Sequence, residues 1–281
     1  MEQIFGHRTN IWKWEQENDT VSEGNQNRKR PMIVYRCETS MESIFTAVYR
    51  AYEEKRVHEE TIISLTEEPL LFAEDIWVEP DERKVCKVIN TLNRRFGQDN
   101  YLTLCMALAS EDADSAQAVY RTIVQGLAGN VSKGHLFDNL ADDYVHRAFA
   151  LARTVNTEIG HQKQFLRFGE LENGVLYSRI GPKNDVVVFL MPHFADRLPM
   201  ENFMIYDDVH NLFGIHPAGR PWYLLRGGET ELPIHLSEEE IRYQELFRQF
   251  CHTITIEERK NTKLQRNMLP LRFRKYMVEF S

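Results

Sequence analysis

The chain has 281 residues, of which 42% are hydrophobic and 11% aromatic, so it can bury the core of one large or two smaller domains. No apolar run approaches the roughly 18 residues of a membrane span, and the first residues lack the layout of a secretory signal. Four scattered cysteines without a Cys-x-x-Cys pair argue against a zinc ribbon, an iron–sulfur cluster and a disulfide framework. We therefore expect a cytoplasmic protein with reduced thiols, no membrane contact and no cofactor of its own.

The first half of the chain predicts a flexible extension followed by a region of strands and helices. Residues 1–31 hold a polar run without apolar periodicity, which is typical of a flexible lead-in. A region rich in strands and helices is expected over 32–140. Its predicted elements are a strand at 32–37, a helix near 44–52 capped by Ser40 or Thr39, a strand at 74–79, and helices at 81–97, 101–110 and 115–127.

The second half, residues 141–281, predicts an α+β domain. A long amphipathic helix begins near Asp142, and strands at 165–170 and 175–180 flank the Glu-Asn-Gly turn at 172–174. Further strands are expected at 203–207, 212–215 and 222–225. Residues 185–198 fit a strand or a helix, and we favour a helix capped by Asn184 or Asp185.

Three helical segments are expected at the C-terminal end. A capping box at Ser237 begins a helix through Phe250, with Ile241, Phe247 and Phe250 facing inward. Asn261 can cap the next helix, and Pro270 suits the first turn of the last one. The expected fold class is α+β, with a helical middle region followed by a mainly antiparallel sheet that C-terminal helices cover.

Charge is segregated along the chain. The formal net charge is −8, yet residues 259–276, which we call the basic segment, carry +7, so the remainder sums to −15. A cationic strip on an acidic protein attracts a polyanion at one place, and aromatic side chains within it can stack on bases. A solvated helical face is the alternative. The candidate nucleic-acid-binding residues of the segment are Arg259, Lys260, Asn261, Lys263, Gln265, Arg266, Arg272, Phe273, Arg274, Lys275 and Tyr276.

The best candidate for catalysis lies at 191–197. On a helix, His193 and Arg197 share a face with Asp196 beside them. An imidazole next to a carboxylate and a guanidinium can move a proton or hold a phosphate, so His193 and Asp196 are the candidate catalytic pair and Arg197 a candidate anion ligand. A polar network that pins this helix onto the sheet explains the same spacing.

Other polar clusters have both a functional and a structural interpretation. Glu158 and His161 are one helical turn apart, and Arg167 after them can bind phosphate or cover the edge of the sheet with its stem. Asn261 and Gln265 can read an adenine edge or act as a helix cap and a surface amide. Asp207 and Asp208 supply too few oxygen ligands for a metal site, and none is predicted.

Several of these segments together resemble a bacterial family of DNA-repair or DNA-metabolism proteins with a C-terminal domain of unknown function. The resemblance rests on segments 165–168, 192–197, 205–207 and 258–265, with Pro270 and residues 276–279, and extends to a strand at 33–35 and a helix at 45–52. The motifs agree in order and spacing over roughly residues 32–281. The polar N-terminal extension is not part of the family's pattern.

The resemblance implies a partner. Members of that family usually occur beside a radical-SAM DNA-repair protein, which would carry an iron–sulfur cluster and S-adenosylmethionine. Some members carry a uracil-DNA-glycosylase-like domain at the C-terminus, which we do not expect in this chain because it stops at Ser281.

Three hypotheses follow from the sequence. The favoured one is a DNA-binding accessory to a radical-SAM repair enzyme. The second is an enzyme that acts on nucleic acid or a damaged base, with His193 as general acid/base and Arg167, Arg197 and Arg259 as anion clamps. The third is a structural adaptor whose polar motifs only stabilise the fold.

Overall fold

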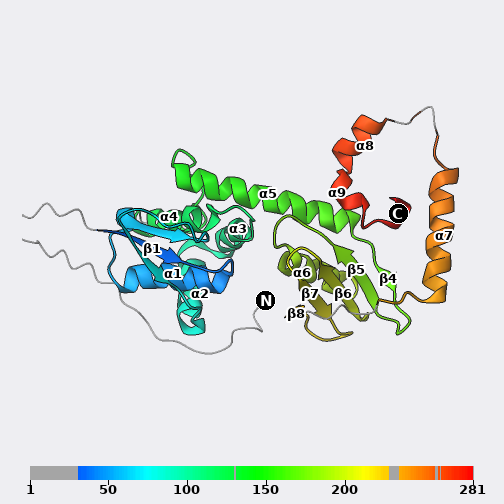
Figure 1. Ribbon diagram of the computed structural model, residues 1–281, viewed down its shortest axis with the longest axis horizontal. Coiled ribbons are helices and arrows are strands. Elements are labelled where there is room, and N and C mark those ends of the chain that lie inside the picture. The colour runs from blue at the N-terminus through cyan, green and yellow to red at the C-terminus, as the bar shows by residue number, and fades with distance from the viewer. Residues whose placement is uncertain (1–30, 130, 228–233, 257–258, 260, 281) are drawn as a thin grey trace, which may run out of the picture. The chain divides into compact units, whose positions relative to one another are not determined.

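A computed structural model describes residues 31–129, 131–227, 234–256, 259 and 261–280 (Figure 1). The chain divides into two compact units. The first unit runs up to Leu102 and includes Ala116–His146, and the second holds Thr103–Ser115 and the chain from Arg147 onward. The division into 32–140 and 141–281 stays a prediction, and the extension expected at residues 1–31 falls almost wholly outside the described residues.

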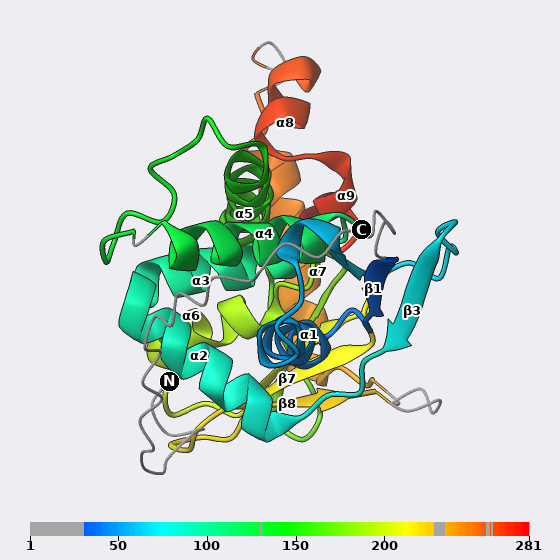
Figure 2. The same ribbon diagram turned by 90° about the vertical axis from the view of Figure 1, so that its left-hand side faces the viewer.

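The first unit is built on a parallel three-stranded sheet in the order β2-β1-β3. The central strand is buried at Ile33, Val34 and Tyr35 because a neighbouring strand lies on each side of it. Helices α1 and α2 pack against each other (Figure 2). The elements are β1 (Met32–Arg36), α1 (Met41–Glu53), η1 (His58–Glu60), β2 (Thr61–Ser64), β3 (Ala73–Trp77), α2 (Glu82–Phe96), α3 (Gln98–Leu108) and α4 (Ser115–Ala128), with α3 crossing into the second unit.

Local signals in the sequence account for the starts of α1 and α2. The Ser40 hydroxyl accepts from the Ser43 amide at 3.2 Å, which confirms one of the two predicted caps of α1. Asp81 caps α2 by accepting from the Arg83 amide at 2.9 Å. The sequence did not predict β2. It is a four-residue strand, and its partner β1 lies far from it in the sequence.

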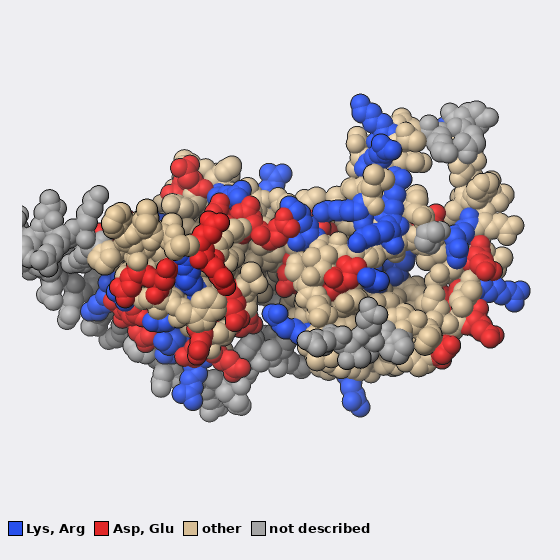
Figure 3. Space-filling view, viewed as in Figure 1, with Lys and Arg blue, Asp and Glu red and all other residues tan. Residues whose placement is uncertain are grey.

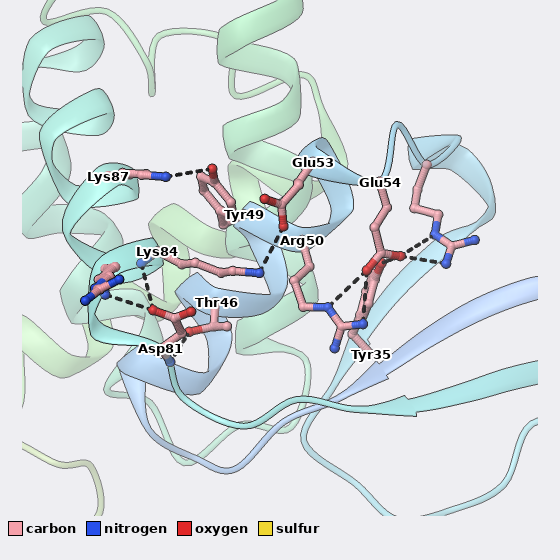
Figure 4. A network of polar contacts seen from close by, with 11 residues as sticks. Tyr35, Thr46, Tyr49, Arg50, Glu53, Glu54, Asp81, Lys84 and Lys87 are labelled. Carbon is pink, nitrogen blue, oxygen red and sulfur yellow. Dashed lines mark hydrogen bonds and ion pairs between the residues drawn. The ribbon is translucent and has the colours of Figure 1, made fainter. Parts of the chain in front are cut away.

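A polar network ties α1 to the central strand (Figure 4). The Tyr35 hydroxyl donates to the Glu54 carboxylate at 2.9 Å, and Arg50 and Arg56 form ion pairs with the same carboxylate at 3.0 and 2.6 Å. Burial alone would raise the pKa of Glu54, but these three hydrogen bonds outweigh it and the net shift is downward. The buried phenol of Tyr35 is thereby satisfied at the end of α1.

The second unit contains a mixed five-stranded sheet in the order β4-β5-β6-β7-β8. Only β5 and β6 are parallel, because α6 crosses over between them, and the other three pairs are antiparallel. This mixed α/β architecture, with helices in the middle and at the C-terminal end, confirms the predicted fold class. The elements are α5 (Asp143–Phe165), β4 (Gly169–Glu170), β5 (Leu176–Ile180), α6 (Val187–Arg197), β6 (Phe203–Asp207), β7 (Leu212–His216), β8 (Tyr223–Arg226), α7 (Glu238–Thr253), α8 (Thr262–Met268), α9 (Leu271–Arg274) and η3 (Val278–Phe280).

The core of the second unit lies between one face of the sheet and helices α5 and α6. Leu190 and Met191 of α6 are fully buried and pack with Phe203 and Ile205 of β6. Helix α6 approaches β7 closely at Gly214, where an added Cβ would stand 2.4 Å from the Met191 sulfur. One face of the sheet is thus committed to packing.

Two predicted boundaries near this core are corrected. The expected strand at 165–170 is only β4, because α5 continues to Phe165. Helix α6 begins at Val187 and has no side-chain cap. The Asn184 side chain, one of the two predicted caps, instead donates to the Glu158 carboxylate at 2.6 Å and accepts from the Glu111 amide at 3.2 Å.

Helix α7 differs most from its prediction. Ser237 caps it as expected, accepting from the Glu240 amide at 3.1 Å. Its apolar side chains are nevertheless exposed, with Ile241 at 46%, Phe247 at 41% and Phe250 at 56%. The expected inward face is therefore wrong. Amphipathic spacing marks the apolar side of a helix but not what lies against it.

No helix among the described residues is both long enough and apolar enough to cross a membrane.

We predict opposite effects for two helical glycines. A Cβ on Gly126 of α4 would lie 2.5 Å from Leu136 and 2.7 Å from Phe96, whereas a Cβ on Gly160 of α5 meets nothing within 4 Å. Gly126→Ala should lower the free energy of unfolding by about 1–3 kcal/mol through overpacking. Gly160→Ala should raise it by up to about 1 kcal/mol through helix propensity. Urea unfolding measures both, and a stable Gly126→Ala protein would contradict the packing.

Candidate nucleic-acid interface

The basic segment forms two short helices that turn back toward the body of the second unit. Asn261 caps α8 as predicted, because its side-chain oxygen accepts from the Leu264 amide at 2.9 Å. Pro270 is the residue before α9, one position earlier than the first turn. The last described element is the short 3-10 helix η3.

Two apolar side chains anchor this segment. Phe273 and Met277 are each only 3% exposed. The Phe273 ring packs against Phe165 and His161 at the end of α5, with ring centroids 5.4 and 5.5 Å apart. Figure 1 shows α9 lying beside that end of α5. Burying a Phe side chain of this kind contributes about 1.5–3 kcal/mol, so the segment is held in place.

A hydrogen bond also attaches the basic segment to the end of strand β6. The Tyr276 hydroxyl lies 2.8 Å from both carboxylate oxygens of Asp208, the residue after β6. Burial, followed by this contact with Asp208, raises the pKa of the Tyr276 phenol, which stays protonated. The position requires glycine at 181, since a Cβ there would stand 1.9 Å from the phenol oxygen. Tyr276 thus occupies space that only a glycine leaves open.

Two ion pairs add to the attachment. Arg272 reaches the buried carboxylate of Glu158 at 3.1 Å, and Arg167 reaches Glu279 at 2.9 Å. Glu158 also accepts from the backbone amides of Lys183 and Asn184, both at 3.0 Å. One carboxylate of α5 therefore holds the loop before α6 and the start of α9 together. The two guanidinium groups are 43% and 35% exposed, so each pair is partly screened by solvent.

The cations on α8 and just before it have no such pairing with the described residues. Arg259, Lys263 and Arg266 are exposed, and no ion pair joins them to a carboxylate within the described part of the chain. Figure 3 shows Lys and Arg side chains gathered along α8 and α9. Adjacent unneutralised cations raise the local potential, which favours an anionic ligand at this place.

Two further cations lie over aromatic rings. The Arg274 guanidinium is 4.8 Å from the centroid of Phe280, and the Lys275 ammonium is 4.3 Å from that of Tyr276. These contacts orient both side chains without neutralising their charge. Arg274 and Lys275 therefore add to the positive surface that begins on α8.

The structure changes the roles of other predicted members of the segment. Phe273 was expected to stack on bases, but its burial makes it an anchor instead. The Asn261 oxygen is engaged in the cap of α8, whereas the Gln265 side chain is exposed. Lys260 lies outside the described residues.

The predicted catalytic residues on α6, His193 and Asp196, do not form a hydrogen bond with each other. His193 is half-buried, and burial, followed by the charges of Lys163 and Arg197, lowers its pKa, which favours a neutral imidazole. The structure shows no hydrogen bond between His193 and Asp196, which is exposed. The candidate clamp Arg167 is bound to Glu279 instead. A catalytic role for His193 stays a prediction.

Sequence reasoning missed a histidine–carboxylate pair at the turn after β6. The His210 Nδ1 lies 2.6 Å from the Asp207 carboxylate, which is fully buried and also accepts from the backbone amides of Val209 and His210. The hydrogen bond to Asp207 raises the pKa of His210. The three-residue spacing was the available signal. Within the described residues, no cluster of His, Cys, Asp or Glu is arranged to hold a metal.

Comparison with known proteins matches the basic segment and the five-stranded sheet to a family model. The model of the family DUF4130, described as a domain of unknown function, matches residues 113–279. The match includes the whole five-stranded sheet and the described helices of the basic segment. No curated protein and no solved structure matches the chain.

The His210–Asp207 pair predicts a pH-dependent contribution to stability. Because the folded pKa of His210 is raised, this contribution is full below its unfolded value of about 6.5 and is lost as pH rises through the folded pKa. The loss of unfolding free energy in His210→Ala should therefore shrink as pH is raised from 6 to 9. Urea titrations at several pH values measure it, with His252→Ala, an exposed position on α7, as control. A difference independent of pH would contradict the pair.

Proposed function

We propose that this chain, which belongs to the DUF4130 family, binds nucleic acid through the basic segment and serves a radical-SAM DNA-repair enzyme as an accessory. The observation that carries the first part is the set of exposed cations on α8 and just before it, Arg259, Lys263 and Arg266, which form no ion pair with a carboxylate among the described residues. The second part is supported by the sequence resemblance to proteins that occur beside such an enzyme.

The distribution of charge favours a polyanion over a small anion. The cations extend from α8 through Arg274 and Lys275 of the next helix, so they form an extended surface and not a closed pocket. The chain as a whole carries −8, which repels nucleic acid elsewhere and concentrates binding at this surface. A backbone of regularly spaced phosphates matches such an arrangement.

The anchoring of the segment supports the same function. Phe273 is buried against α5 and Tyr276 is bonded to Asp208, so the cations project from a fixed base. Cations held in place lose less conformational entropy on binding than cations on a loose tail. Arg272 and Arg167, by contrast, are engaged with carboxylates and act in the attachment.

We predict a salt-dependent affinity that falls when α8 loses charge. Lys263→Gln combined with Arg266→Gln should weaken binding of duplex DNA, and should lower the slope of log affinity against log salt by about 0.9 per lost phosphate contact. Fluorescence anisotropy at several salt concentrations measures both quantities. The matched control is Arg94→Gln, an exposed arginine on α2. An unchanged slope in the double variant would contradict binding through α8, and no binding by the wild-type chain would end the proposal.

An exposed apolar stripe on α7 supports the proposed protein partner. Tyr243, Phe247, Phe250 and Ile254 recur at helical spacing and are 73%, 41%, 56% and 57% exposed. A contiguous apolar stripe of this kind marks a protein contact in soluble proteins. We assign this stripe to the radical-SAM protein, which would carry the iron–sulfur cluster and S-adenosylmethionine.

We predict that a charge on the stripe abolishes complex formation. Phe250→Glu should prevent co-elution with the purified radical-SAM DNA-repair protein of the same source, because a carboxylate would be buried in the contact. Since Phe250 is exposed, the variant should unfold at the same urea concentration as wild type. Arg242→Glu, an exposed α7 position off the stripe, is the control. Co-elution of Phe250→Glu at the wild-type affinity would contradict this assignment.

A further inference from the structure

The second face of the five-stranded sheet carries an aromatic surface. Side chains alternate along each strand, and Phe203 and Ile205 of β6 point to the face that α6 covers. The intervening residues, matched across the strands by register, share the opposite face. They are Tyr177 and Arg179 of β5, Met204 and Tyr206 of β6, Phe213 and Ile215 of β7, and Tyr223 and Leu225 of β8.

This face is open at β8 and at the end of β5. Tyr223 and Leu225 are 49% and 54% exposed, and the Arg179 side chain is 59% exposed. A layer packed over the face would bury these side chains, as α6 buries Phe203 and Ile205 of β6 on the other side. Met204 and Ile215 of the same face also line a shallow hollow at the start of β6.

The rings on this face are held in place across the strands. Tyr206 and Phe213 stack with centroids 4.4 Å apart and an interplanar angle of 19°. Arg179 lies directly opposite Tyr206 in the register. Aromatic rings and guanidinium groups both offer flat surfaces on which a nucleobase can stack, and each stacked base contributes about 1–3 kcal/mol.

The basic segment leads to the edge of this face. The Tyr276 hydroxyl binds Asp208, and the Asp208 carboxylate pairs with Arg179 at 3.1 Å. Lys275 lies over the Tyr276 ring. The end of the basic segment therefore lies next to Arg179 and the edge of the aromatic face. A phosphate backbone bound there would have its bases beside the aromatic face.

We propose that this sheet face is a stacking surface for unpaired bases, so that the preferred ligand is a single-stranded nucleic acid. The proposal rests on the proposed function, because it needs the backbone to be bound by the basic segment. The contact of Tyr276 with Asp208, and of Asp208 with Arg179 on this face, favours a nucleic acid over a protein, because one ligand could place its phosphates on the basic segment and its bases on the tyrosine rings. A duplex keeps its bases stacked inside and cannot use the rings.

The test compares oligothymidylate with a duplex of the same length by fluorescence anisotropy. Wild type should bind the single strand more tightly. Tyr223→Ala should weaken single-strand binding about 5- to 150-fold and leave duplex binding unchanged. Tyr223→Phe should retain the affinity, because stacking needs the ring and not the hydroxyl. Tyr144→Ala, which removes an exposed tyrosine from the first turn of α5, is the matched control. Urea unfolding verifies that each variant folds.

The outcomes separate this inference from the proposed function. If Lys263→Gln/Arg266→Gln weakens binding but Tyr223→Ala and Tyr177→Ala do not, the chain binds nucleic acid without stacking, and the inference fails alone. Equal affinity of wild type for single strand and duplex would also overturn it. If wild type binds neither, both fail, and the aromatic face belongs to a protein contact.

Discussion

The arrangement of the second unit depends on the attachment of its C-terminal segment to the sheet. Tyr276 reaches Asp208 only because residue 181 is a glycine, and Phe273 is buried against α5. Helix α8 has seven residues, and a helix of that length is not stable in water by itself. Its cations would also repel one another on a free chain. The anchors below α8 therefore determine where the positive charge is displayed.

Ion pairs with carboxylates separate the cations of the basic segment that attach it to the unit from those that remain available to a ligand. Glu158 is buried and satisfied by two backbone amides and the Asn184 side chain before Arg272 adds its charge. Removing that carboxylate would leave the loop before α6 without its acceptor, which costs more than the partly exposed ion pair contributes. Arg259, Lys263 and Arg266 have no such partner among the described residues. Their charge is therefore available to a ligand.

Local signals in the sequence predicted local structure, but they did not predict which side chains pack against distant parts of the chain. The caps at Ser40, Ser237 and Asn261 depend on residues three positions away and were predicted correctly. Phe273 and Phe250 look alike in the sequence, as apolar residues on amphipathic helices. Phe273 is 3% exposed and Phe250 is 56% exposed. They differ because Phe273 packs against Phe165 of α5, more than a hundred residues earlier in the chain. The three-residue spacing of Asp207 and His210 was visible in the sequence, but the burial of Asp207 depends on the folded sheet.

Hydrogen exchange in the presence of oligothymidylate tests most directly where the ligand lies. Binding through the basic segment should slow exchange of backbone amides at 262–276, and contact with the aromatic face should slow exchange in β8, the exposed edge strand. The strands and helices of the first unit should exchange as before. Protection confined to the first unit, or absent from 262–276 at saturating ligand, would contradict the account.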